Sequence, residues 1–189
     1  MKTPERSNPI TGIIYSDGAI FEAFLHEAVE AMASEGMRLA GLIQRSEPKP
    51  DRLKCDMHLL DLATGNVHKI SDDRGPQARG CVLNTDCLLR ACEAAERGLN
   101  RQTDLLVLCK FGKAEAEGGG FRTLMTRALE LAVPVLIGVP PVNLEAFRAF
   151  AANFAREIEL ASFGTDVRAL AKRLALDVDC VTEELTVVA

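Results

Sequence analysis

Apolar residues follow two alternating patterns along the chain. Continuous apolar runs, typical of buried strands, occupy residues 10–15, 38–44, 104–109 and 133–139. Apolar residues three or four positions apart predict helices that begin near Gly18, Asn84, Phe121 and Asn143. Asn84 or Thr85 is the predicted N-cap of the second of these helices and Asn143 that of the last, since their side chains accept hydrogen bonds from free backbone N–H groups. A last strand is expected at residues 158–164, with a closing helix after Thr165.

The order of these elements predicts the fold class. Strand and helix alternate through most of the chain, which favours an α/β fold with three layers, a mostly parallel sheet between helices. Residues 55–70 depart from the alternation, because two short segments flank the turn A-T-G-N and predict an antiparallel hairpin insertion. A chain of 189 residues is expected to form a single α/β domain, with a flexible N-terminus at residues 1–9.

Composition and charge narrow the function classes. The formal net charge is −5, whereas proteins that bind nucleic acids or membrane surfaces present basic faces, so neither partner is expected. The chain has no apolar run of spanning length and no signal-peptide pattern, which predicts a cytoplasmic location. The six cysteines are then expected to be reduced, and their spacing indicates no metal site. The role of Cys81, at a predicted helix start, stays open.

In an open parallel sheet, ligands bind beyond the carboxyl ends of the strands, so three connections are candidate sites. The first is S-D-G at residues 16–18. An ordinary phosphate loop needs several glycines and a lysine, and this connection has only Gly18. Asp17 is interpreted mainly as a helix N-cap, although Asp17 and Gly18 both stay among the candidate ligand-binding residues.

The second connection, L-C-K-F-G-K-A-E-A-E-G-G-G-F-R at residues 108–122, is richer in candidate chemistry. Three cations (Lys110, Lys113 and Arg122) accompany three glycines whose backbone amides can approach an anion (Gly118, Gly119 and Gly120). Glu115 and Glu117 could balance the cations or hold a metal through water. The alternative interpretation is an exposed loop of mixed charge.

The third connection is the polar segment at residues 71–80, which lies just before a predicted helix. Its Arg79 could clamp an anion from the side, and a solvated loop is the alternative. Gln44, at the end of the second predicted strand, could line the same crevice.

Several segments resemble the bacterial domain of unknown function 2478 family. They are G-L-I-Q after the second strand, R-G-x-C-x-L before the next helix, and K-F-G-K-x-E-x-E-G-G-G-F-R followed by P-V-L. The resemblance covers roughly residues 11–163, and it implies a P-loop-NTPase-like relative of kinase-type triphosphatases that is linked to molybdenum uptake or cofactor genes. In those triphosphatases an acidic pair follows the strand, and it is replaced here by Cys109 and Lys110, so ordinary metal-assisted hydrolysis is not expected.

Three functions are weighed on this basis. The preferred one is a cytosolic accessory protein that binds a small anion, either a nucleotide or an oxyanion such as molybdate, on a degenerate P-loop-like scaffold. The second is a divergent Mg-dependent nucleoside-triphosphatase or phosphotransferase that uses Glu115 or Glu117 and a nucleotide with or without Mg. The third is a regulatory or adapter protein that works by protein contact, for which a homo-oligomer is one form.

Overall fold

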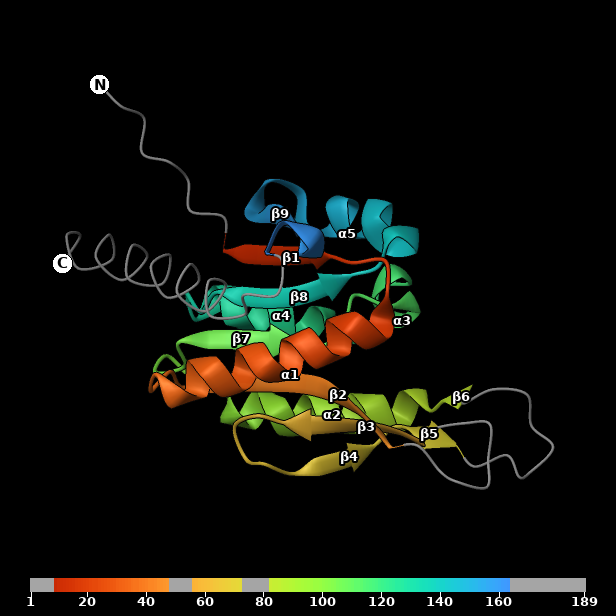
Figure 1. Cartoon of the computed structure of the whole chain (residues 1–189). Coiled ribbons are helices and arrows are strands. Elements are labelled where there is room, and N and C mark those ends of the chain that lie inside the picture. The colour runs from red at the N-terminus through yellow and green to blue at the C-terminus, as the bar shows by residue number, and fades with distance from the viewer. Residues whose placement is uncertain (1–8, 48–55, 73–81, 164–189) are drawn as a thin grey trace.

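A seven-stranded mixed sheet forms the centre of the protein (Figure 1). The computed structural model describes residues 9–47, 56–72 and 82–163. Within them the sheet has the order β4-β3-β2-β7-β8-β1-β9. Its strands are β1 (Ile10–Ile14), β2 (Leu39–Glu47), β3 (Asp56–Asp61), β4 (Val67–Lys69), β7 (Leu105–Leu108), β8 (Val135–Val139) and β9 (Ala155–Glu159). A separate two-stranded ladder joins β5 (Ser71–Asp72) to β6 (Val82–Leu83).

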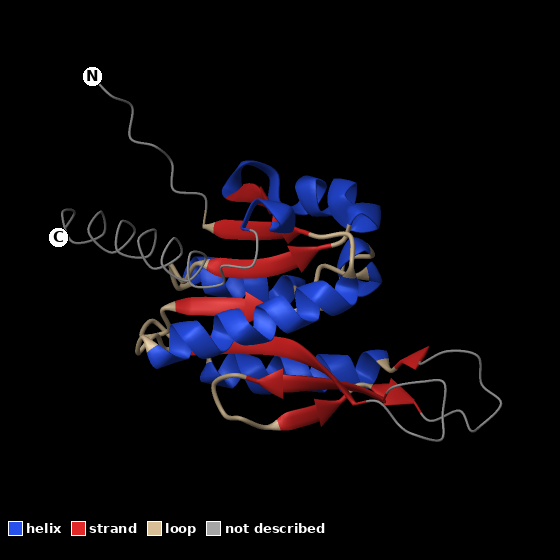
Figure 2. Cartoon of the chain, in the orientation of Figure 1, coloured by secondary structure: helices blue, strands red, loops and turns tan. Residues whose placement is uncertain are grey.

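The strand directions confirm the predicted fold class. The strands β2, β7, β8, β1 and β9 pair in parallel, whereas β3 pairs antiparallel with both β2 and β4. The antiparallel part is the hairpin predicted at residues 55–70. Helix α1 (Gly18–Ser34) lies in front of the sheet in Figures 1 and 2, with α2 (Thr85–Gly98) and α4 (Arg122–Glu130) behind it.

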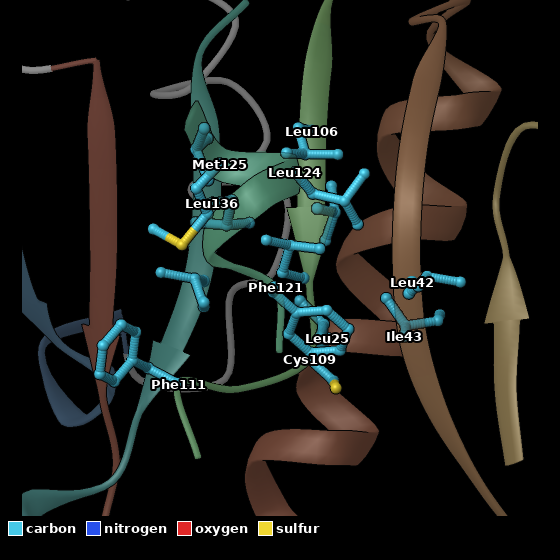
Figure 3. Close-up of a cluster of buried hydrophobic side chains, with 14 of the residues drawn as sticks. Leu25, Leu42, Ile43, Leu106, Cys109, Phe111, Phe121, Leu124, Met125 and Leu136 are labelled. Carbon is cyan, nitrogen blue, oxygen red and sulfur yellow. The ribbon is translucent and has the colours of Figure 1, made fainter. Parts of the chain in front are cut away.

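Every residue of β1, β7 and β8 is buried. Strands covered on both faces need no alternation of polar and apolar residues, which explains the continuous apolar runs of the sequence. Figure 3 shows part of this core, where Leu25 of α1, Leu42 of β2, Leu136 of β8 and Leu124 of α4 gather around the end of β7. The carboxyl ends of the central strands are therefore fixed in position by the packing of the core.

Some elements differ from the sequence-based predictions. The strand predicted at residues 158–164 is wrong in its bounds, since β9 covers Ala155–Glu159 and a 3₁₀ helix follows at Leu160–Phe163. The pattern also missed the four-residue helix α3 (Lys113–Ala116), which is too short to show a helical period. The predicted helix after Thr165 and the predicted flexible N-terminus, apart from Pro9, lie outside the described residues. No helix in the described part of the chain is long and apolar enough to cross a membrane.

Gly41 allows the close pairing of β2 with β7. Its φ is +117°, a conformation that favours glycine, and its Cα faces Val107 of β7. A Cβ atom on Gly41 would overlap the Val107 backbone carbonyl oxygen. The register that pairs Leu39–Leu42 of β2 with Leu105–Leu108 of β7 therefore depends on a residue without a side chain.

We expect Gly41→Ala to lower the free energy of unfolding by at least about 3 kcal/mol, because backbone strain and overpacking add. Gly65→Ala is the matched control: its φ is also positive, at +74°, but its Cβ would meet no atom within 4 Å. It should cost only about 1–2 kcal/mol. Urea denaturation of both variants measures the difference, and equal losses would contradict the steric argument.

Candidate functional site

The candidate site lies at the carboxyl edge of the sheet, where β1, β7 and β8 end and β2 continues past the end of β7. Parallel strands bring the connections that follow them to one edge, which is where ligands bind in open α/β sheets. The connections that meet there are residues 15–17 after β1, 109–112 after β7 and 140–143 after β8, together with Gln44 of β2.

The connection from β1 to α1 consists of only Tyr15, Ser16 and Asp17. The Asp17 carboxylate accepts hydrogen bonds from the backbone N–H groups of Ala19 at 2.8 Å and Ile20 at 3.1 Å, so the predicted N-cap is confirmed. These are the amides that would face an anion at the start of a helix. In this short connection the two amides are bonded to the protein's own Asp17 carboxylate.

Tyr15 continues this connection into the core. Its ring stacks on that of Phe21 at 4.2 Å between centroids, with the planes 4° apart. Burial, together with the neighbouring Cys109, raises the pKa of Tyr15 to about 12, so the phenol stays protonated at neutral pH.

The connection from β7 to α4 is organised by Glu115. This side chain is only 3% exposed, and its two carboxylate oxygens accept the backbone N–H groups of Gly112 at 2.7 Å and Phe121 at 2.8 Å. A Cβ atom on Gly120, whose φ is +58°, would overlap Glu115 Oε1. Glu115 and Gly120 therefore fit against each other inside the loop.

Gly118 and Gly119 also form hydrogen bonds within this loop. Gly118 donates its N–H to the Glu115 carbonyl at 3.1 Å, and Gly119 donates to the Ala114 carbonyl at 2.9 Å. Gly118 also adopts a φ of +100°, which a larger residue would adopt only with strain. Two of the three predicted anion-binding amides are thus bonded within the loop.

Arg122 is held by neighbours on three segments. Its Nε donates to the Glu115 carbonyl at 2.6 Å, and its guanidinium carbon lies 4.7 Å from the ring centroid of Phe150 and 5.8 Å from that of Phe111. A guanidinium above aromatic faces is stabilised by the ring quadrupole. These contacts position the start of α4. Contact between Arg122 and a ligand stays a prediction.

Asn143 corrects one sequence-based expectation. It precedes α5 (Leu144–Ala151), but its side-chain amide donates to the Phe111 carbonyl oxygen at 2.9 Å. The predicted cap of α5 by the Asn143 side chain is therefore wrong. The side chain instead ties the connection after β8 to the one after β7, which sequence spacing could not indicate.

Two pockets open beside the ends of β2 and β7. The α1 pocket has a volume of about 240 Å³ and includes Tyr15, Glu22, His26 and Gly18 in its lining. The α2 pocket has a volume of about 230 Å³ and lies toward α2, with Lys113 and Glu115 in its lining. Both pockets share Gln44, Cys109 and Lys110, so these three residues form the row that separates them.

The shared row and the α1 pocket carry several polar contacts. Gln44 donates from Nε2 to Glu22 Oε2 at 3.2 Å, and its backbone carbonyl lies 2.8 Å from His26 Nε2. Glu22 and His26 lie four residues apart on one face of α1, so they reach the end of β2 together. Burial raises the pKa of Cys109 to about 12, so this thiol is uncharged at neutral pH.

Lys110 provides the positive charge of the row. Its side chain is exposed at the end of β7, and no carboxylate of a described residue forms a salt bridge with it. Lys113, one turn further along, pairs with Glu117 at 3.6 Å between two exposed side chains, an arrangement that contributes little. The described residues contain no group of three histidine, cysteine or acidic side chains placed to hold a metal ion.

The structure brings together only part of the predicted site. Gly18, Gln44, Lys110, Lys113 and Glu115 line one or both pockets, whereas Gly118–Gly120, Asp17 and Arg122 are not among the described lining residues of either. Arg79 lies outside the described residues. Tyr15, Glu22, His26 and Cys109 also line the α1 pocket and were not among the predicted ligand-binding residues, although the positions of Tyr15 and Cys109 directly after buried strands were a signal for them.

Comparison with known proteins places this geometry in a family. The model of the family described as "Protein of unknown function (DUF2478)" matches residues 10–163. The chain belongs to this family. The resemblance stated from the sequence is therefore confirmed, and the DUF2478 match covers every strand and helix described above.

Two further proteins are similar to this DUF2478 chain. One is "Molybdenum import ATP-binding protein ModC 2" of Bradyrhizobium diazoefficiens, which is 26% identical over 182 residues. That match includes 94% of this chain but only 20% of the length of the relative. The other is the crystal structure of THEP1 from the hyperthermophile Aquifex aeolicus, with a TM-score of 0.54 and 18% identity, covering 87% of this chain and 96% of THEP1. The architecture is thus a P-loop-NTPase-like α/β fold with an antiparallel part.

Asp17→Ala should lower the free energy of unfolding by about 1 kcal/mol, because α1 loses the acceptor for two of its first N–H groups. Asp86→Ala, in the first turn of α2, is the control because Asn84 already caps that helix, accepting from Cys87 N. Thermal and urea denaturation measure both changes. No loss in Asp17→Ala would contradict the capping role.

Glu115→Gln should lower the free energy of unfolding by about 2–3 kcal/mol, because an amide accepts with only one oxygen and leaves a buried N–H without its partner. Glu117→Gln is the matched control, since its side chain is 67% exposed, and it should change the stability by less than about 0.5 kcal/mol. If urea denaturation gives the same midpoint for both variants, Glu115 does not hold the loop.

Proposed function

We propose that this protein binds a small anionic ligand, a nucleotide or an oxyanion such as molybdate, beside Lys110 at the carboxyl edge of its sheet. The observation that carries the proposal is the position of Lys110. It lines both pockets at the end of a central strand, and none of the described carboxylates forms a salt bridge with it. A cation at the mouth of apolar walls attracts an anion more strongly than the same cation surrounded by water.

The surroundings of Lys110 favour a compact anionic group. In the α1 pocket Glu22 accepts a hydrogen bond from Gln44, and its negative charge offsets part of the positive charge of Lys110. The net positive charge of this pocket is therefore small. Gln44 can contribute amide hydrogen bonds from the shared row, and Lys113 adds a second cation at the α2 pocket. Such a site suits one phosphate or oxyanion group better than a triphosphate with its metal.

The role proposed for this site is binding rather than hydrolysis. Asp17 occupies the amides at the start of α1, and Glu115 is bonded to two backbone N–H groups of its own loop. Glu117 pairs with Lys113 at the surface. Each acidic side chain that a metal-assisted triphosphatase would draw on in these two connections already has a protein partner, which supports an accessory function.

A link to molybdenum metabolism belongs to the same proposal. The relative named as a molybdenum import ATP-binding protein is similar over 94% of this chain, which corresponds to a fifth of its own length. We infer that the chain acts in the cytoplasm as an accessory binding protein in the handling of molybdenum, and that its ligand is either the oxyanion or a nucleotide that accompanies it.

Lys110→Gln should weaken anion binding about tenfold or more, because a charge-assisted hydrogen bond of at least about 1.5 kcal/mol is lost. Calorimetric titration of the full chain with molybdate, tungstate, inorganic phosphate, AMP and ATP measures this. Arg101→Gln removes an exposed cation before β7, which is not among the described lining residues of either pocket, and should change the affinity for the bare anions less than about threefold.

Two results would overturn the proposed function. One is that the wild-type chain binds none of these anions in the millimolar range. The other is that Lys110→Gln binds them as well as the wild type does. Release of phosphate from ATP and Mg²⁺ above the rate in buffer would instead favour a triphosphatase.

A further inference from the structure

The α2 pocket has a lining that a bare oxyanion does not use. Most of its wall consists of apolar side chains, namely Met57, Leu59, Ile70, Leu83, Leu88 and Phe121. The cations among its lining residues are Lys110 and Lys113, from the connection that follows β7. An apolar pocket with a few polar groups at one side is the usual form of a site for an organic ligand.

We propose that the α2 pocket binds the flat, largely apolar ring of an organic anion whose phosphate or carboxylate lies at Lys110. This inference rests on the proposed function, since both use Lys110, and it names the class of ligand. The ligand would be a nucleobase or a similar heterocycle that carries an acidic group, rather than an inorganic oxyanion alone.

The floor of the α2 pocket is formed by the protein core. Leu59, Leu88 and Phe121 are 1%, 4% and 3% exposed, so they are fixed by packing whether or not a ligand is present. Leu83, at 36% exposure, and the half-buried Met57 form outer parts of the lining. A ring in the pocket would cover these two side chains and remove apolar surface from water, which favours binding.

The α1 pocket is adjacent to the α2 pocket, so a ligand in the α2 pocket can meet both apolar and charged groups. Gln44, Cys109 and Lys110 line both pockets, so a ring in the α2 pocket lies next to the polar side chains of the α1 pocket. The dividing row carries a single formal charge, that of Lys110, because the buried thiol of Cys109 stays protonated.

Glu115 is the acidic group in the lining of the α2 pocket. Its carboxylate is buried, and the dipoles of the Gly112 and Phe121 N–H groups point at it. These two hydrogen bonds offset part of its negative charge, so Lys110 and Lys113 dominate the field at the opening. An acidic group of the ligand is therefore expected at the lysines and its ring at the apolar wall.

A set of three probes separates the ring from the acidic group: inorganic phosphate, phenyl phosphate and 1-naphthyl phosphate. Calorimetric titration of the full chain should give at least tenfold tighter binding for an aryl phosphate than for phosphate. Leu83→Gln should remove most of this gain and leave the affinity for phosphate unchanged. Leu89→Gln, at an exposed leucine of α2 that is absent from the described lining of either pocket, is the matched control and should keep the gain.

Methyl-labelled NMR locates the ring independently of affinity. The methyl signals of Met57, Leu59, Leu83 and Leu88 should shift on addition of 1-naphthyl phosphate, whereas that of Leu89 should not. Lys110→Gln should weaken binding of phosphate and aryl phosphates alike.

Each outcome decides between the two proposals. Equal affinity for phosphate and aryl phosphates, or a gain that survives Leu83→Gln, would overturn the inference on the ring and leave the anion site at Lys110 standing. Shifts confined to methyl groups outside the α2 pocket would also overturn it. If Lys110→Gln leaves the affinity for all three probes unchanged, or if the wild-type chain binds none of them, the proposed function and the inference are both overturned.

Discussion

A single buried carboxylate fixes the connection on which the candidate site depends. Glu115 accepts hydrogen bonds from Gly112, at the start of α3, and from Phe121, just before α4, so it closes the intervening turn into one conformation. Phe111 donates its N–H to the Gly138 carbonyl of β8 at 2.7 Å, which anchors the other end of the same connection. Lys110 lies directly before this anchor, and its location between the two pockets follows from these backbone contacts.

This arrangement shows how a charged, glycine-rich segment can be internally satisfied. The cations, acids and glycines of residues 108–122 suggested a ligand loop, but many of them are partners of one another or of the nearby rings. The same composition suits a ligand-binding loop and a loop that is bonded internally. Part of the difference lies in the contact between Arg122 and Phe150, which is far away in the sequence. Sequence spacing could find the loop and its place at the sheet edge, but not the partners of Arg122 or Glu115.

The scaffold was predictable to a greater extent, and for physical reasons. Strands covered on both faces leave long apolar runs, so β1, β7 and β8 were visible in the pattern, and the caps at Asp17 and Asn84 followed from their residue types. Asn143 has the same residue type as Asn84, but its side chain donates to the Phe111 carbonyl instead of capping α5. Similarity to THEP1 confirms the fold at 18% identity, but a shared fold does not establish a shared function.

The three-residue connection from β1 to α1 also limits what point substitutions can achieve at this junction. A glycine-rich loop that wraps a phosphate chain is several residues longer than Tyr15, Ser16 and Asp17, and it must leave the first amides of the helix open. Point substitutions alter side chains but cannot lengthen the backbone. An ordinary phosphate loop at this junction would therefore require an insertion together with loss of the Asp17 cap, since a longer loop alone would leave these amides bonded to the carboxylate.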